Sequence, residues 1–217
     1  MMTSSDFFDD SFKTVEENIS AIHDELLEKP RDITLNKRYA EILLAYQNEH
    51  RIREARESLR IVLKERPDDL DANILKIRTY RLLGDIKHAQ FELELLLESN
   101  PKNPDVLEEQ GRIYLNKGSF SLAEECLSKA FTISPHNARI GRALSEAFHN
   151  QNKFADELTI SSTLVNQDPN DPKNIQYKAF ALISNDRMEE SISFLENFRK
   201  KYPHEFATRF WSRGGKE

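Results

Sequence analysis

Residues that could act as nucleophiles, general bases or metal ligands do not form a known catalytic pattern in this sequence. The six histidines show no ligand spacing on one helix face, and there is no Gly-rich phosphate loop, HExxH, CxxC or G-x-S-x-G segment. Cys126, the single cysteine, follows two glutamates and has no sequence neighbour that would lower its pKa. We therefore expect no enzyme activity, no metal and no cofactor.

Arginine is the residue type with the clearest potential for recognition. Guanidinium groups can bind a carboxylate through two parallel hydrogen bonds. Arg78 and Arg112 are separated by about 34 residues, so a chain that repeats with this period would stack them at equivalent sites. Their chemistry therefore depends on whether the chain is such a repeat.

Five prolines mark a repeat of this length, because Pro67, Pro101, Pro135, Pro169 and Pro203 follow one another at a constant interval of about 34 residues. Proline lacks an N–H group and clashes with the carbonyl four residues earlier, so it ends a helix or follows one. Each proline comes after a helical stretch and is followed by Asp or Asn residues suited to cap the next helix. The pattern predicts a series of helical hairpins.

Other positions make the chain similar to the tetratricopeptide repeat family. When each proline is taken as position 32, the repeats are 36–69, 70–103, 104–137, 138–171 and 172–205. The third repeat matches the family pattern best, through Leu107, Gly111, Tyr114, Ala123, Leu127, Ala130 and Pro135. The resemblance covers residues 36–205 and implies an all-α, right-handed α-solenoid of about five helix-turn-helix repeats within a span of 31–205.

The resemblance also implies a concave groove lined by positions 2, 5, 9 and 12 of each repeat's first helix. The groove residues that we expect to bind a partner are Leu44, Arg78, Arg81, Glu108, Arg112, Arg139, Arg142, Glu146, His149 and Phe180. The middle of the groove is charged and its ends are more apolar. A protein or peptide segment is the expected occupant, and an acidic segment is one option. Alternatively, Glu108–Arg112 and Arg142–Glu146 are i,i+4 pairs that satisfy each other.

The family's chaperone-tail clamp does not fit this sequence. That clamp has Lys at position 5 and Asn at position 9 of one repeat, and no repeat here carries this pair. The expected function is a non-catalytic scaffold or adaptor. The alternatives are a secretion-type or assembly chaperone that shields a partner, a self-assembling scaffold, and a regulatory subunit of an enzyme on another chain.

The two ends are expected to cover the terminal repeats, because solenoid ends need caps. Residues 14–30 predict a capping helix, with Thr14 and Glu17 at capping-box spacing. Residues 1–13 are expected to form a disordered or loosely docked acidic-aromatic tail. Residues 206–217 predict a short capping helix and tail in which Phe206, Phe210 and Trp211 cover the last repeat; the alternative is a patch for homo-oligomers.

Composition narrows the class of partner. The net charge of −6 is unlike that of a nucleic-acid binder, which carries a basic face. No apolar run approaches the roughly 18 residues that span a bilayer. The first residues lack the basic and apolar regions of a signal peptide, and one cysteine fits a reducing compartment. We expect a cytoplasmic protein without nucleic-acid or membrane partners.

Repeat four, residues 138–171, departs from the family pattern. Position 20 is Glu157 instead of a small residue, position 24 is Ser161, and the stretch between Leu158 and Thr163 is rich in β-branched and Ser residues. One hypothesis is that this repeat is a soft joint in the array. The other is a register adjustment in which Ala155 or Leu158 packs instead.

Overall fold

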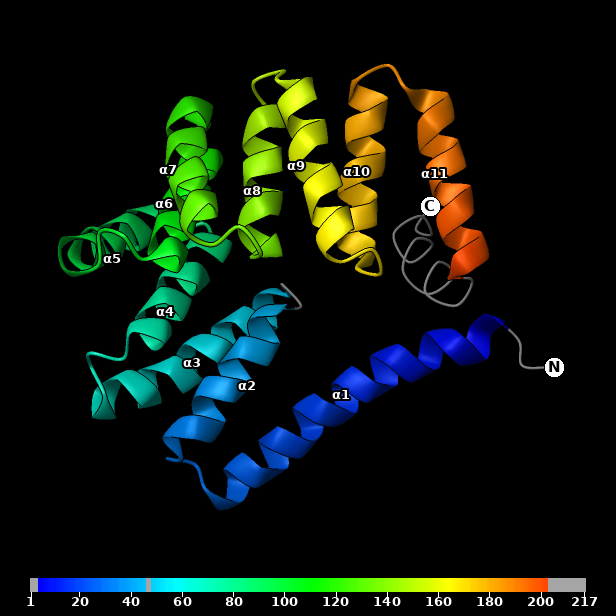
Figure 1. Cartoon of the computed structure of the whole chain (residues 1–217). Helices are drawn as coiled ribbons and strands as arrows, with labels where there is room; N and C mark the ends of the chain where they lie inside the picture. The colour runs from blue at the N-terminus through cyan, green and yellow to red at the C-terminus, as the bar shows by residue number, and fades with distance from the viewer. Residues whose placement is uncertain (1–3, 46–47, 203–217) are drawn as a thin grey trace. The chain divides into compact units, whose positions relative to one another are not determined.

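The structure is a computed structural model that describes residues 4–45 and 48–202, with side chains described from residue 16 onward in these ranges. Within the described residues there are eleven α-helices and no strand. Their bounds are α1 Ser4–Glu28, α2 Ile33–Ala45, α3 Glu49–Glu65, α4 Leu70–Leu82, α5 Ile86–Ser99, α6 Pro104–Asn116, α7 Phe120–Ile133, α8 Ala138–His149, α9 Phe154–Gln167, α10 Pro172–Ser184 and α11 Met188–Lys201 (Figure 1). The predicted all-α class is confirmed.

The chain divides into two compact units, residues 10–102 and residues 103–217, the latter grouped with residues 1–9. The first unit holds the hairpins α2/α3 and α4/α5, and the second holds α6/α7, α8/α9 and α10/α11. The division falls at the end of the second predicted repeat, whereas the sequence pattern runs through this point without a change of period.

The hairpins that follow the first begin with a side-chain cap that recurs with the period of the prolines. The capping residues lie two positions after the repeating prolines and are Asp69, Asn103, Asn137 and Asp171. Each accepts a hydrogen bond from a backbone N–H in the first turn of the helix that follows, which is α4, α6, α8 or α10 respectively. These bonds satisfy N–H groups that have no partner inside the helix. The period of the prolines is therefore also the period of the helix starts.

The turns inside these hairpins repeat with the same period. Gly84, Gly118, Asn152 and Asp186 all have positive φ, at 77°, 72°, 57° and 59°. Glycine adopts this left-handed conformation at little cost, and Asn and Asp are the side chains that tolerate it best. The last two hairpins thus make the same turn as the others with less suitable residues.

In the first unit, α1 covers the first hairpin. Ile22 is buried in a cluster with Tyr39 and Leu43, and Ile19 and Leu26 pack against this cluster. Glu16 of α1 also forms an ion pair with Arg51 of α3. The capping helix predicted over 14–30 ends at Glu28 and begins earlier than expected, at Ser4, so residues 4–13 are part of α1 where a tail was expected. The predicted cap formed by Phe206, Phe210 and Trp211 lies outside the described residues.

Small residues allow close helix approach in the second unit. A Cβ atom on Gly111 of α6 would run into the buried side chain of Leu127 in α7, and a Cβ on Gly141 of α8 would lie 2.6 Å from Leu164 Cδ2 in α9. Both glycines are buried within their helices, so here the absence of a side chain is what the packing requires.

The first helices of successive hairpins contact one another: α2 contacts α4 in the first unit, and α6 contacts α8 and α8 contacts α10 in the second. Among the described helices, no second helix of a hairpin contacts the second helix of the next within its unit. Because the first helices lie closer together, each unit curves toward them. The first helices therefore line the inner side of each unit.

Repeat four keeps the register of its neighbours. Glu157 and Ser161 in α9 are buried, with exposed fractions of 4% and 0%, whereas Ala155 is exposed. The register adjustment is therefore wrong for Ala155, whereas Leu158 is half-buried and its part in the packing stays a prediction. The soft joint stays a prediction.

Candidate protein-binding face

The inner side of the second unit is formed by α6, α8 and α10, which start from equivalent caps. Asn103 Oδ1 accepts from Asp105 N at 2.9 Å, Asn137 Oδ1 from Arg139 N at 3.1 Å, and Asp171 Oδ1 from Lys173 N at 2.8 Å. Residues at the same repeat position consequently lie in rows across the three helices. Seven of the ten predicted groove residues belong to these rows.

A buried carboxylate organises the charged part of this face. Glu108 has no exposed surface, and its two oxygens lie 2.6 Å from Arg112 Nε and 2.6 Å from Arg139 Nε. Arg139 also forms an ion pair with Asp105, and Arg112 Nη2 donates to the backbone oxygen of Arg139 at 3.1 Å. The cluster of Asp105, Glu108, Arg112 and Arg139, here called the ionic brace, links α6 to α8.

The ionic brace stabilises the charged form of Arg112. Burial opposes the charged form of Arg112, but the adjacent Glu108 carboxylate outweighs burial and raises the pKa of this guanidinium above its ordinary value. Removing one partner of a buried pair leaves an uncompensated charge. Arg112 Nε, Arg112 Nη2 and Arg139 Nη2 thus donate to carboxylates and a carbonyl of the chain itself, whereas Arg139 Nε and Glu108 Oε2 are close as opposite charges without a hydrogen bond between them.

Arg142 makes a separate link between α8 and α10. Its Nη1 donates to Asp171 Oδ2 and to Asn174 Oδ1, both at 2.8 Å. This partner differs from Glu146, the i,i+4 residue that the sequence suggested, whereas the i,i+4 pair Glu108–Arg112 is present. Arg112, Arg139 and Arg142 each hold a carboxylate of their own chain.

The face is exposed at positions 9 and 12 of the last two repeats, and Lys173 at position 2 of the last repeat is also exposed. On α10, Phe180 is 56% exposed and Ile183 is 38% exposed, and on α8 Glu146 and His149 are exposed. His149 Nδ1 lies 3.4 Å from Ser184 Oγ, which brings the ends of α8 and α10 together. These four residues, Glu146, His149, Phe180 and Ile183, are here called the inner patch.

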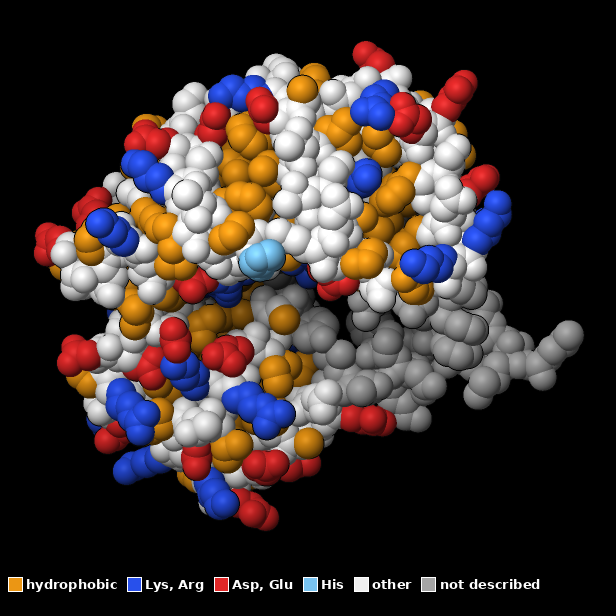
Figure 2. All heavy atoms as spheres, viewed as in Figure 1, with side chains coloured by type: hydrophobic (Ala, Val, Ile, Leu, Met, Phe, Trp, Pro, Cys, Tyr) orange, Lys and Arg blue, Asp and Glu red, His pale blue; other side chains and the backbone are white. Residues whose placement is uncertain are grey.

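Figure 2 shows hydrophobic side chains at the surface over α10 and between α10 and α11, with charged side chains around them. Single exposed apolar residues are ordinary on a protein surface, but an aromatic and an aliphatic residue side by side are suited to recognition.

His149 connects the inner patch to the unusual residue of repeat four. Its Nδ1 lies 3.2 Å from Glu157 Oε2, and its ring meets the ring of Phe154 at 5.9 Å. Burial raises the pKa of Glu157 above its ordinary value, and the hydrogen bond from His149 acts against this.

The other three predicted groove residues lie in the first unit. Leu44 is only 5% exposed and belongs to the hydrophobic core, so its expected place on a binding surface is wrong. Arg78 is half-buried and Arg81 is 9% exposed, both on α4. Lys37 of α2 forms an ion pair with Asp71 of α4 at 2.9 Å, which links these two inner helices.

The sequence analysis did not identify which charged residues of neighbouring inner helices form ion pairs, although the repeat period indicated two of these pairs. Lys37–Asp71 and Asp105–Arg139 are both pairs of opposite charges separated by one repeat period, at position 2 of neighbouring repeats. Opposite charges at the repeat period predict an ion pair between adjacent inner helices. The contacts of Asp171, Asn174 and Glu157 follow no such period.

Within the described ranges, no group of three or more His, Cys, Asp or Glu residues could hold a metal ion. Over the same part of the chain, no helix combines the length and the apolar character needed to cross a bilayer. Cys126 is buried, its Sγ lies 3.3 Å from Gln110 Oε1, and burial raises the pKa of its thiol.

The fold and this face define a helical repeat protein. Two family models described as tetratricopeptide repeat match the chain, one over residues 48–113 and the other over residues 104–137. Residues 48–137 thus match the tetratricopeptide repeat family, as the sequence pattern predicted for this part of the chain. No curated protein matches the chain.

Solved structures share the fold. TTC0263, a thermophilic TPR protein of Thermus thermophilus, is 17% identical with a TM-score of 0.70, over 82% of this chain and 96% of its own. MamA from Desulfovibrio magneticus RS-1 is 17% identical with a TM-score of 0.58, over 77% and 93%. Human IFIT1, in a dimer with m7Gppp-AAAA, is 14% identical with a TM-score of 0.73, over 91% of this chain and 50% of its own.

Proposed function

We propose that this chain is a non-catalytic scaffold that holds a segment of a partner protein against the inner patch. The tetratricopeptide fold supports protein–protein interaction in general, because its stacked hairpins expose an extended inner surface. The segment is anchored by an apolar side chain that packs on Phe180 and Ile183.

The single observation that carries this proposal is the contrast within one face. The charged side chains of the ionic brace are engaged between α6 and α8, whereas Phe180 remains 56% exposed on α10. Burying an apolar side chain of this size contributes about 1.5–3 kcal/mol. The driving force available to a partner therefore lies in the inner patch, and the brace fixes the helices that present it.

An acidic segment is less well supported than an apolar one. A partner carboxylate would have to compete with Glu108 for Arg112 and Arg139, and with Asp171 for Arg142. Glu146 is exposed within the inner patch and favours a basic residue beside the apolar anchor. The ion pairs of these arginines within the chain, together with the net charge of −6, support a protein partner over an anionic ligand such as the m7Gppp-AAAA bound to IFIT1.

Site-specific crosslinking followed by binding measurements tests the proposal. A photoreactive phenylalanine analogue at position 180 should crosslink one defined segment, which is then synthesised and titrated against the full chain. Phe180→Glu should weaken binding of that peptide at least tenfold. Leu122→Glu, at a residue of α7 that is 47% exposed, is the matched control and should leave binding unchanged.

Equal binding of the captured peptide by the wild type and Phe180→Glu would overturn the proposal. Equal loss with Leu122→Glu would do the same, because the effect would then be general charge repulsion and not contact at the inner patch.

A further inference from the structure

A second apolar surface lies on α5 in the first unit. Phe91 is 60% exposed and Leu95 is 51% exposed. Residues four apart lie on the same side of a helix, so these two side chains form one stripe. Neither residue belongs to the inner side, since α5 is the second helix of its hairpin.

The repeat provides an internal comparison for this stripe. Residues at the position of Phe91 in the other repeats are Glu57, Glu125, Thr159 and Ser193, and those at the position of Leu95 are Ile61, Lys129, Thr163 and Asn197. In α7 the equivalent residues form an exposed ion pair, with Lys129 Nζ 2.7 Å from Glu125 Oε1. The fold therefore does not require apolar residues at these two positions, and only the second repeat has both.

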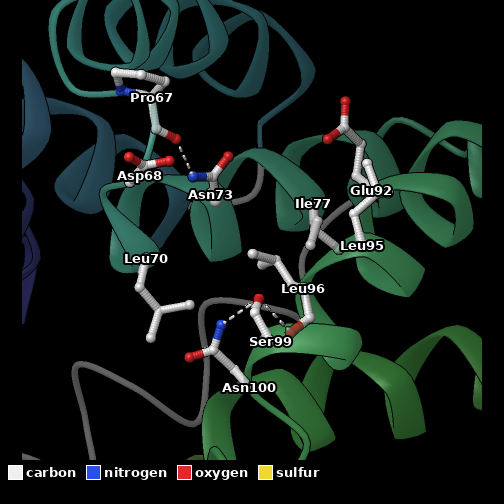
Figure 3. Close-up of a pocket in the computed structure, with 10 residues that line it drawn as sticks. All are labelled: Pro67, Asp68, Leu70, Asn73, Ile77, Glu92, Leu95, Leu96, Ser99 and Asn100. Carbon is white, nitrogen blue, oxygen red and sulfur yellow. Dashed lines mark hydrogen bonds between the residues drawn. The ribbon is translucent and has the colours of Figure 1, made fainter.

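The stripe borders a hollow between α4 and α5. The cavity has a volume of about 520 Å³ and its lining includes Leu70, Ile77, Leu95 and Leu96. Figure 3 shows the Leu96 side chain pointing from α5 toward the side of α4 that carries Leu70 and Asn73. A hollow of this size next to an exposed ridge can accept apolar side chains from a helix that lies along it.

Most of the charges around this surface are acidic. Among the described residues, the charged side chains that line the hollow are Asp68 and Glu92, and Glu92 forms an ion pair with Lys76 at 2.8 Å. α5 carries Glu92, Glu94 and Glu98, and its one Lys, Lys87, lies in the first turn, four residues before Phe91. Glu94 and Glu98 flank the stripe on one side and Glu92 on the other.

We propose that the stripe and the hollow, together called the outer patch, bind an amphipathic helix of another protein whose apolar face is bordered by Lys and Arg. Apolar residues of the partner fill the hollow and pack on Phe91 and Leu95, while its basic residues face Glu94, Glu98 and Asp68. A second copy of the chain fits less well, because a two-fold interface would bring these acidic borders together. The chain can then join two partners, one on each patch.

The test uses the full chain and three synthetic peptides, each long enough to form roughly four helical turns. One peptide has Leu at helical a/d spacing with Lys elsewhere, the second replaces each Lys with Glu, and the third scrambles the first. Binding is measured by calorimetry near physiological ionic strength, where long-range charge attraction is screened. We expect the Leu/Lys peptide to bind at least tenfold more tightly than the other two.

The matched variant is the double substitution Phe91→Glu with Leu95→Lys, which copies Glu125 and Lys129 of the next repeat. This double variant should bind the Leu/Lys peptide at least tenfold more weakly than the wild type and should keep the helical circular dichroism of the wild type. Phe180→Glu should leave the affinity for this peptide unchanged, which distinguishes binding at the outer patch from binding at the inner patch.

Three results would overturn the proposal. The first is no binding of the Leu/Lys peptide to the wild type, and the second is equal binding to the double variant. The third is a wild-type dimer in sedimentation that the double variant abolishes, because the occupant would then be a second copy of the chain.

Discussion

Glu108 shows at the residue scale how the inner side is held together. Its carboxylate is fully buried between Arg112 and Arg139, whereas Glu125 and Lys129 form the same i,i+4 kind of pair with 60% of each side chain exposed. Similar pairs in sequence therefore have different surroundings. Exposed pairs contribute little, while breaking a buried pair leaves an uncompensated charge.

We expect Glu108→Gln to lower the free energy of unfolding by about 3–5 kcal/mol, because two guanidinium groups lose their shared carboxylate. Urea unfolding of the full chain measures this change. Glu125→Gln, the matched control in α7, should unfold like the wild type within error. A small effect of Glu108→Gln would show that the brace does not hold α6 and α8 together.

Glu157 provides the pH-dependent prediction. Burial raises its pKa above the ordinary value of 4.5, so the folded state favours the protonated acid. The stability that this residue contributes is fully present below the unfolded pKa and is lost as pH rises through the folded pKa. Glu157→Gln removes this loss, so the variant should gain stability relative to the wild type as pH rises from below 4.5 through the folded pKa of Glu157.

Urea unfolding at a series of pH values checks the sign of this difference. Glu125→Gln again serves as the control, because its carboxylate is exposed. A difference between Glu157→Gln and the wild type that stays constant, or that shrinks as pH rises, would show that burial does not dominate at this site.

At the scale of the elements, the turns inside the last four hairpins share a residue with positive φ, but this residue is Gly in two of them and Asn or Asp in the other two. Asn152 adopts a φ of 57° where the third repeat has Gly118 at 72°. A residue other than Gly in this conformation costs about 1–3 kcal/mol, and the greater freedom of Gly in the unfolded chain offsets part of this.

We therefore expect Asn152→Gly to stabilise the chain by about 0.5–1 kcal/mol. The reverse type of change, Gly118→Ala, should cost about 1–2 kcal/mol although a Cβ there would meet no atom within 4 Å. Thermal unfolding measures both variants. A destabilised Asn152→Gly would mean that the Asn side chain supports the turn in a way that its φ does not reveal.

The elements were the most predictable part of the molecule. The prolines and the Asp or Asn two residues later determine where α4, α6, α8 and α10 begin, and these are local effects that neighbouring residues suffice to produce. The start of α1 at Ser4 was missed, although Phe8 and Phe12 continue the helical spacing of the apolar residues of α1 that follow them.

At the scale of the whole molecule, the candidate site was predictable only as a set of positions. The family resemblance assigned Phe180 and Leu44 to one groove, but Phe180 is exposed and Leu44 is buried. Likewise, Arg112, Arg139 and Arg142 form ion pairs with Glu108 and Asp171 of their own chain, and their binding of a partner stays a prediction. Position numbers fix which helix face a residue occupies, whereas burial and pairing depend on side chains from other repeats.

The inner and outer patches suggest how a chain without a predicted catalytic motif could act. Each patch combines exposed apolar residues with acidic neighbours, and the two patches lie on different helices of different units. The variants of one patch are controls for the other, so the two proposals can fail separately.

Hydrogen exchange with and without the captured segment tests most directly whether the inner side recognises a partner. If it does, amides of α8 and α10 should gain protection in the complex, and Phe180→Glu should abolish this gain. Protection confined to α9 and α11, or a gain that persists in Phe180→Glu, would contradict recognition through the inner patch.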